Sequence, residues 1–240
     1  MTKKTCAKRA KTSPFFVALF VLLAIYSLML VGLLVWAMIA SLKAPRDFQT
    51  NPVGLPEKIV NNFAAAIKLY KIQVGGIKGQ PLYAMFPQML YNSVMYSVGC
   101  ALINTAVTCI TAYCCARYKY NLSRIVYVVV LVTMTIPIVG SLPSQIQVAQ
   151  GLHIYNTIWG MWLQSASFLG LYFLVFYETF ASLPNSFFEA ARLDGAGDLS
   201  LLFRIALPLA GNVFLTIFLL NFITYWNDYQ TPLLFLKPMP

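Results

Sequence analysis

The segment 181–207 holds the residues whose types and spacing suggest a specific chemistry. Ser186 and Glu189 have the spacing of a capping box, in which the serine oxygen accepts from the amide of residue 189 and the glutamate reaches back to the amide of residue 186. This pattern predicts a short helix from Phe187 to about Asp194. The chemistry that these side chains offer is hydrogen bonding at a helix end.

The residues that follow extend this pattern. Gly195 suits the left-handed conformation that ends a helix, and Asp198 is placed to cap a second helix that leads through Pro208 into an apolar run. The segment is therefore predicted to form a compact helix–turn–helix. From the residues alone, a plain connector between two longer elements is the favoured explanation, and a docking site for another protein is the alternative.

Residues for metal binding or nucleophilic catalysis are scarce in the sequence. His153 is the only histidine, so no Cys/His spacing suits a metal. Neither a His-Glu-x-x-His motif nor the Gly-x-x-x-x-Gly-Lys-Ser/Thr loop that cradles ATP phosphates occurs. A membrane-embedded enzyme is therefore disfavoured, and we expect no cofactor in this chain. Of the five cysteines, Cys6 lies in the N-terminal tail, and the four that share one apolar run are interpreted as small packing residues of a membrane helix: Cys100, Cys109, Cys114 and Cys115.

The composition indicates that lipid is the natural solvent. Hydrophobic residues make up 59% of the 240 residues and charged residues only 10%, whereas a soluble domain carries about 25% charged residues. The net charge of +10 raises the question of a nucleic acid partner. The basic residues, however, lie in tails and loops between long apolar runs, as topology signals do, and this distribution excludes that partner.

The long apolar runs predict an all-α, polytopic membrane protein. At about 1.5 Å per residue, the first run crosses a hydrocarbon core of about 30 Å with some tilt, and it is too long for the core of a signal peptide. The third run contains Pro137, which should end or kink its helix. The expected transmembrane helices, within a permease domain of residues 15–240, are 15–39, 89–116, 125–142, 157–177 and 209–226.

The distribution of Lys and Arg predicts the orientation of these helices. The tail 1–14 and the connection 117–124 are rich in basic residues, whereas the next connection, 143–156, holds neither Lys nor Arg. This contrast places the N-terminus and the connection 117–124 in the cytoplasm. Alternation then makes the segment 181–207 cytoplasmic and the loop 43–88 external. That loop is also basic, but long loops obey the charge rule poorly.

The expected spans contain no Asp, Glu, Lys, Arg or His side chain. Secondary transporters that couple to ions usually place such groups inside the membrane. An ion-coupled secondary transporter is therefore the weaker alternative, although sodium held by backbone carbonyls would need no ionisable group. A non-catalytic scaffold subunit is a further alternative. The neutral polar residues within the spans include Asn104, Thr105, Gln164, Ser165 and Asn221.

The segment 181–207 resembles the EAA loop of binding-protein-dependent ABC importer permeases. The likeness, in residue type and in spacing, rests on Glu189-Ala190-Ala191, Asp194-Gly195-Ala196, Ile205 and Leu207-Pro208. Other pieces agree in order along nearly the whole chain: Asn92-Ser93, Ala112-Tyr113, Ala116-Arg117, Ile136-Pro137, Gly151-Leu152, Asn156-Thr157 and Trp226-Asn227. Together they are similar to the carbohydrate branch, which includes maltose-type and multiple-sugar systems.

The resemblance implies a type I ABC importer permease in a bacterial-type inner cell membrane. Its partners would be a second permease subunit, two ATP-binding cassette subunits that bind ATP and Mg²⁺, and an extracellular or periplasmic solute-binding protein. The EAA loop would form a coupling helix that sits in a groove of an ATPase subunit. The docking residues carried over are Glu189, Ala190, Ala191, Asp194, Gly195 and Ala196.

The chain departs from the family pattern in two places. Gly211-Asn212 stands where the family often has a basic residue and a proline. The family also usually has a sixth span, so we expect five transmembrane helices of six and a truncated chain.

The last expected span carries the candidate substrate path. Asn221 lies deep in this span and should face protein or water, because an uncompensated amide in lipid is costly. Tyr225, Trp226 and Asn227 lie near its outer end. Aromatic rings can stack on sugar faces, but the favoured interpretation of Tyr225 and Trp226 is an aromatic belt at the membrane interface. The sequence does not identify the sugar.

Overall fold

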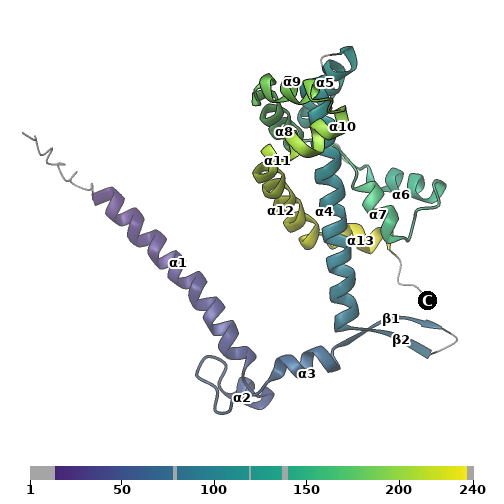
Figure 1. Cartoon of the computed structure of the whole chain (residues 1–240). Coiled ribbons are helices and arrows are strands. Elements are labelled where there is room, and N and C mark those ends of the chain that lie inside the picture. The colour runs from purple at the N-terminus through teal and green to yellow at the C-terminus, as the bar shows by residue number, and fades with distance from the viewer. Residues whose placement is uncertain (1–13, 78–79, 119, 137–139, 237–240) are drawn as a thin grey trace, which may run out of the picture. The chain divides into compact units, whose positions relative to one another are not determined.

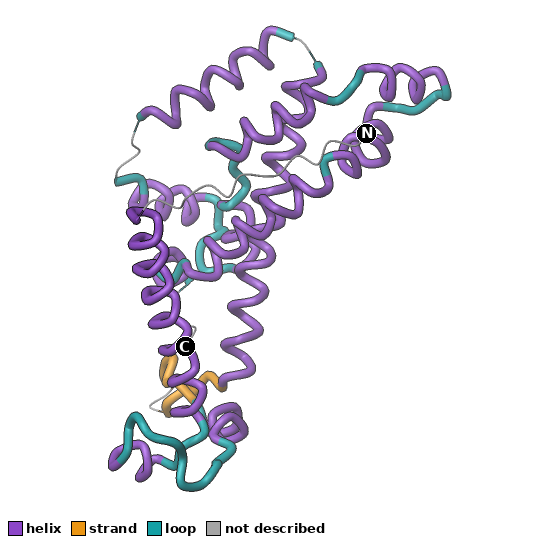
Figure 2. The backbone as a smooth tube through the Cα atoms, turned by 90° about the vertical axis from the view of Figure 1, so that its left-hand side faces the viewer, coloured by secondary structure: helices purple, strands orange, loops and turns teal. Residues whose placement is uncertain are grey.

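The computed structural model describes residues 14–77, 80–118, 120–136 and 140–236, so most of the basic tail lies outside the described residues. The chain divides into two compact units, residues 1–71 and 72–240. Figure 2 shows that most of the described backbone is helical, with loops and one pair of strands between the helices.

The first unit is built on one long apolar helix, α1 (Pro14–Ser41), which has no buried residue. A helix that is apolar on every side needs lipid or other helices around it. Two short helices follow, α2 (Pro45–Thr50) and α3 (Asn62–Leu69). The amide of Asn62 donates to the carbonyls of Ser41 and Lys43 at 2.8 and 2.7 Å, which fastens the start of α3 to the end of α1.

The expectation of an all-α chain is wrong in one place, because a two-stranded sheet precedes the second long helix. Its strands are β1 (Lys71–Ile77) and β2 (Gln80–Met85). The sequence here contains β-branched residues and a Lys78-Gly79 pair, a composition that favours a hairpin over a helix. The other regular elements of the described chain are all helices.

The second unit is organised around α4 (Phe86–Arg117), a helix of 32 residues. α12 and α8 pack along it, and α7 contacts it further toward its start (Figure 1). The other helices of this unit are α5 (Asn121–Thr135), α6 (Leu142–Gly151), α7 (Ile158–Gln164), α8 (Leu171–Ser182), α9 (Asn185–Leu193), α10 (Asp198–Ser200), the π-helix η1 (Leu201–Ala206), α11 (Leu207–Leu209), α12 (Gly211–Asn227) and α13 (Gln230–Phe235).

Two buried clusters hold these helices against α4. The larger one, near the end of α4, joins Tyr113 to three phenylalanines of α8, Phe173, Phe176 and Phe180, all of them fully buried. The second lies nearer the start of α4. It consists of Tyr96, Cys100, Ala149, Met161 and Phe235.

The helix expected over 157–177 is not continuous. It is divided into α7 and α8 by the segment 165–170, where Gly170 has φ +130°. The serines of this segment bond to nearby backbone: the Ser165 hydroxyl donates to the Trp162 carbonyl at 2.7 Å, and the Leu169 amide donates to the Ser167 hydroxyl at 3.3 Å. Such local bonds compete with a helix, which explains the break.

The expected number of five spans is likewise not found as five long helices. Among the described residues, α1 and α4 are long and apolar enough to cross a bilayer. A third span results if the pair formed by residues 198–209 and α12, which is bent by 79°, counts as one. The helix expected over 125–142 corresponds to α5, which ends at Thr135, just before the proline at 137, as the proline predicts.

Candidate functional site

The helix α9 ends in the way that Gly195 predicts. Gly195 has φ +83°, and its amide donates to the Arg192 carbonyl at 3.0 Å. The Ala196 amide donates to the Ala191 carbonyl at 2.9 Å. These two bonds form a complete Schellman motif, which satisfies carbonyls at the helix end and reverses the chain. The expected helix and turn are therefore present.

The predicted capping box at the start of α9 is wrong. The helix begins at Asn185 with Pro184 at the cap position and no side-chain cap bond, so Ser186 already lies inside the first turn. Asp198 is likewise the first residue of α10 and does not cap it. The Glu189 side chain is exposed and, among the described residues, has no hydrogen-bond partner. Its carboxylate is consequently available to another molecule.

The predicted docking residues lie on α9 and on the turn that follows it, at this end of the unit. Glu189, Ala190, Asp194 and Gly195 are exposed, while the small side chains Ala191 and Ala196 are half-buried against the core. Beside them lies an open hollow of about 760 Å³, whose lining includes Gly195, Leu199, Phe203 and Arg204. Ala191, Asp194, Gly195 and Ala196 line this hollow, whereas Glu189 lines a second one beside Arg117 and Tyr118.

Arg117, at the end of α4, contacts the start of this loop. Its guanidinium donates to the Asn185 side-chain oxygen at 2.7 Å and to the Leu183 carbonyl at 2.9 Å. The same group lies 3.7 Å from the centre of the Phe188 ring, and Phe188 is the buried residue of α9. Sequence reasoning treated Arg117 only as a topology charge and as part of a motif. No spacing rule links it to residues 66–71 positions further along.

Tyr118, the next residue, contacts the end of the same loop. Its hydroxyl donates to Asp198 at 2.7 Å, and Asp198 also pairs with Arg192 at 3.3 Å. That ion pair is mostly exposed, so it contributes little by itself. Burial, and then the hydrogen bond to Asp198, raises the pKa of the Tyr118 phenol, which therefore stays a neutral donor at neutral pH.

The loop returns to the membrane-facing helices through a π-helix and a bend. In η1 the Leu207 amide donates to the Leu202 carbonyl, one residue further back than in an α-helix. Pro208 follows and has no amide to donate, which weakens the α-helical ladder at this point. The chain then bends by 79° into α12. Irregular helical turns of this kind are frequent at functional sites.

The predicted substrate residue Asn221 is buried and faces protein. Its amide donates to the Asn104 side-chain oxygen at 3.0 Å and to the Thr105 hydroxyl at 2.9 Å, both on α4. The Asn104 amide in turn donates to the carbonyls of Ser165 and Ser167, and the Thr108 hydroxyl donates to Ser167 at 3.0 Å. These side chains form a polar network that connects α4, α12 and the break 165–170.

This network explains how a break in a helix is tolerated within an apolar unit. Unpaired carbonyls in an apolar environment cost several kcal/mol, about 4–8 by transfer to a solvent that cannot hydrogen-bond. Non-helical backbone is tolerated at membrane depth only where protein or water satisfies it. Asn104 and Thr108 supply donors to Ser165 and Ser167 at this point.

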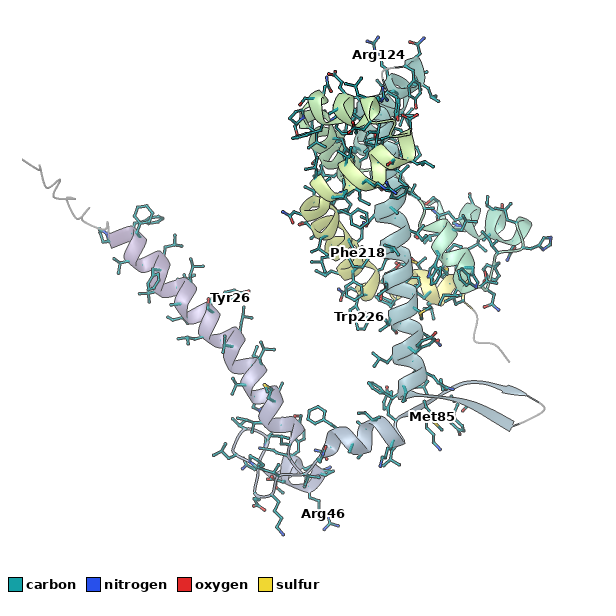
Figure 3. All side chains as sticks on the ribbon, viewed as in Figure 1. Tyr26, Arg46, Met85, Arg124, Phe218 and Trp226 are labelled. Atoms are coloured by element: carbon teal, nitrogen blue, oxygen red, sulfur yellow. The ribbon has the colours of Figure 1, made fainter. Side chains whose placement is uncertain are left out.

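The other three candidate substrate residues lie at the end of α12 and do not form one site. Tyr225 is half-buried, and its ring meets that of Tyr96 edge-on at 6.2 Å. Trp226, labelled in Figure 3, is exposed and contacts Phe222. The Asn227 amide is exposed and donates to the Ile223 carbonyl one turn back. Within the described part of the chain no His/Cys/Asp/Glu group could hold a metal ion.

The family follows from comparison with known proteins. The chain belongs to the family of binding-protein-dependent transport system inner membrane components, whose model matches residues 104–238, more than half of the chain. It is thus a permease component of an ABC importer, not its ATPase, and a multi-pass protein of the inner membrane.

Named relatives refine the comparison. The chain is 26% identical over 213 residues to the diacetylchitobiose uptake system permease protein NgcG of Streptomyces coelicolor, covering 88% of this chain and 66% of that one. It is 30% identical over 161 residues to the polygalacturonan/rhamnogalacturonan transport system permease protein YtcP of Bacillus subtilis, covering 65% and 54%. It is 29% identical over 151 residues to the sn-glycerol-3-phosphate transport system permease protein UgpE of Yersinia enterocolitica, covering 63% and 53%. The chain therefore spans about half to two thirds of these relatives.

One solved structure supports the fold. It is the crystal structure of a bacterial ABC transporter involved in the import of the acidic polysaccharide alginate. The two share 21% sequence identity with a TM-score of 0.73, over 95% of this chain and 78% of that one. This chain therefore shares its fold with a chain of that transporter.

Proposed function

We propose that this chain is one of two permease subunits of a sugar importer and that α9 is its coupling helix. The observation that carries this proposal is the geometry of α9: a short helix, ended by a left-handed glycine, with Glu189 and Ala190 exposed on a face fastened to the end of α4. A rigid, exposed helix of this kind suits insertion into a groove of another protein. The family membership supports an ATPase subunit as that protein.

The proposed assembly contains a second permease subunit, two ATP-binding cassette subunits and an external solute-binding protein. ATP and Mg²⁺ are bound by the cassette subunits. Closure of these subunits would push on α9 and switch the permease between inward-facing and outward-facing states. In the proposed orientation the N-terminus and the segment 181–207 are cytoplasmic.

A carbohydrate is the proposed solute class. Two of the named relatives carry a saccharide or polysaccharide in their names, and so does the description of the structural neighbour. The proposed path runs along α12, past Asn221 and toward Tyr225, Trp226 and Asn227. Asn221 would reach the solute only after its bonds to Asn104 and Thr105 part, because it is buried.

Replacing Glu189 tests the docking surface. We expect Glu189→Ala to leave the amount of protein in the membrane unchanged, because the carboxylate has no partner among the described residues. The variant should reduce co-purification of the ATPase subunit. Glu178→Ala, which removes an exposed carboxylate from α8 instead, is the matched control. Equal retention of the ATPase in both variants would contradict a docking role for Glu189.

Reconstitution tests the function itself. The complete complex in liposomes, with its binding protein, should take up a radiolabelled sugar only when ATP is present. The panel of probes is diacetylchitobiose, alginate oligosaccharide, a pectic oligosaccharide and sn-glycerol-3-phosphate. Uptake by the purified chain alone and without ATP would overturn the proposal in favour of a secondary transporter. ATP-driven uptake of glycerol phosphate and of no sugar would overturn the carbohydrate assignment alone.

A further inference from the structure

Both ends of the coupling segment are fastened to two consecutive residues of the same helix end. Arg117 bonds to Leu183 and Asn185, just before and at the start of α9. Tyr118 bonds to Asp198, just after the turn that follows α9. Between these two attachments, Phe188 is the only residue of α9 that is buried. Its ring lies against the guanidinium of Arg117 and 6.5 Å from the ring of Tyr113.

The type of side chain at position 117 matters for this attachment. A guanidinium is planar, so it can donate in its own plane to two acceptors and still stack its face on an aromatic ring. Arg117 does all three at once, with Asn185, Leu183 and Phe188. A lysine keeps the positive charge but presents a compact ammonium group that cannot reproduce this combination.

The helix that carries this attachment also carries the buried polar network. Asn104 and Thr105 lie on the same α4 as Arg117 and bond to Asn221 of α12. Asn104 also bonds to the break 165–170. A continuous helix of 32 residues therefore links the coupling segment with the elements that surround the network. Rigid secondary elements of this kind can carry energetic coupling between two sites.

We propose that Arg117 and Tyr118 are positioning residues that make α9 and α4 move as one body. A push on α9 would then reach the Asn104–Asn221 contact through α4, in addition to the covalent route through the π-helix η1. The inference rests on the proposed function, because it takes α9 to be the helix on which the ATPase acts.

The test measures whether α9 moves relative to α4 when the ATPase binds nucleotide. Spin labels are placed at Ser186 on α9 and at Ile110 on α4, both exposed, in a chain whose native cysteines are replaced by alanine. The distance between the labels is measured by pulsed electron paramagnetic resonance in the full complex, without nucleotide and with ATP trapped by vanadate. In the unmodified loop the distance should be the same in both states.

Two variants separate the attachment from the fold. In Arg117→Lys, which keeps the topology charge, we expect the distance to change with nucleotide. Tyr118→Phe, which loses only the hydroxyl bonded to Asp198, should show a smaller change. Arg124→Lys, an exposed arginine in the same connection, is the control and should behave like the unmodified chain. A role confined to folding would alter yield or thermal stability, but would not produce a distance that depends on nucleotide.

Each outcome decides a different question. If both variants keep a distance independent of nucleotide, the positioning role is overturned, and η1 alone carries the coupling. If Arg117→Lys does not assemble, Tyr118→Phe decides the matter by the same measurement. If the ATPase does not co-purify with the chain carrying the natural Arg117 and Tyr118, the proposed function fails, and this inference fails with it.

Discussion

Gly195 illustrates how one backbone conformation defines the proposed docking surface. Its φ of +83° lies in the region that residues with a side chain rarely adopt, and nothing lies within 4 Å of the place where a Cβ would be. The requirement for glycine is therefore conformational and does not arise from crowding within this chain. The left-handed residue ends α9 and redirects the chain so that Glu189 and Ala190 remain on an exposed face.

Substitution of Gly195 should separate conformation from bulk. Gly195→Val places a β-branched residue in the left-handed region, at a cost of about 1–2 kcal/mol or more. We expect the variant to reach the membrane but to lose ATP-driven uptake and to retain less ATPase. Asparagine is similar in size to valine but tolerates the left-handed conformation. Gly195→Asn should therefore keep more of the ATP-driven uptake and retain more of the ATPase than Gly195→Val. Normal uptake and ATPase retention in Gly195→Val would leave residues 183–207 as a plain connector.

Asn221 allows a test of the buried polar network in the second unit. Asn221→Ala removes a donor from Asn104 and Thr105, and leaving buried acceptors unsatisfied costs about 1–3 kcal/mol. We expect a lower melting temperature of the purified complex. Asn227→Ala, which removes an exposed amide bonded only within its own helix, should change stability by no more than about 0.5 kcal/mol.

A double-mutant cycle completes this experiment. The effects of Asn221→Ala and Asn104→Ala should not add, because both residues belong to one network. Strict additivity would show that the two amides act independently. A rise in the solute KM beyond what the loss of stability explains would support Asn221 as part of the solute path.

At the scale of elements, the features visible in the sequence are those set by neighbours along the chain. The apolar runs predicted α1 and α4, Pro137 predicted the end of α5, and Gly195 predicted the end of α9. The break at 165–170 was missed because local serine hydrogen bonds only favour it, and its carbonyls also need donors from Asn104 and Thr108, about 60 residues away. The capping box was wrong because α9 starts two residues earlier than its spacing implies.

The contacts of Arg117 and Tyr118 could not have been predicted for the same reason. Their partners, Leu183, Asn185 and Asp198, are brought close only by the packing of α8 along α4. That packing depends on the phenylalanines of α8. Apolar residues occur on several sides of this helix, so the sequence does not show which of them face α4. The sequence therefore indicated the residues proposed for docking, but not the contacts of Arg117 and Tyr118 beneath them.

Gly99 tests how closely two of these elements approach. A Cβ at this position would lie 2.1 Å from the Trp162 indole, which donates to the Met95 carbonyl at 3.1 Å. Gly99→Val should therefore push α7 away from α4 and destabilise the complex by about 1–3 kcal/mol. Gly32→Val in α1, where nothing lies within 4 Å, is the matched control. Equal thermal melting of the two variants would show that the indole moves aside freely.

At the scale of the whole molecule, the structure supports one part of the proposed topology. The connection that begins at Arg117 and the segment that contains α9 lie at the same end of α4, since Arg117 contacts Asn185 and Phe188. Figure 3 shows Arg124 at this end and Trp226 well along α4 toward its start. The basic connection and the coupling segment should consequently share one side of the membrane, which the positive-inside rule identifies as the cytoplasm.

Labelling of cysteines in intact cells tests which side this is. In a chain whose native cysteines are replaced by alanine, Ser182→Cys lies next to α9 and Gln49→Cys lies in the loop 43–88, and both positions are exposed. An impermeant maleimide added outside should label Gln49→Cys at once. It should label Ser182→Cys only after the membrane is permeabilised, because the proposed orientation puts the 117–124 connection and α9 on the cytoplasmic side. Labelling of Ser182→Cys in intact cells would show that the orientation is the opposite of the proposed one. α9 would then lie on the wrong side of the membrane for a cytoplasmic ATPase, and it could not act as a coupling helix.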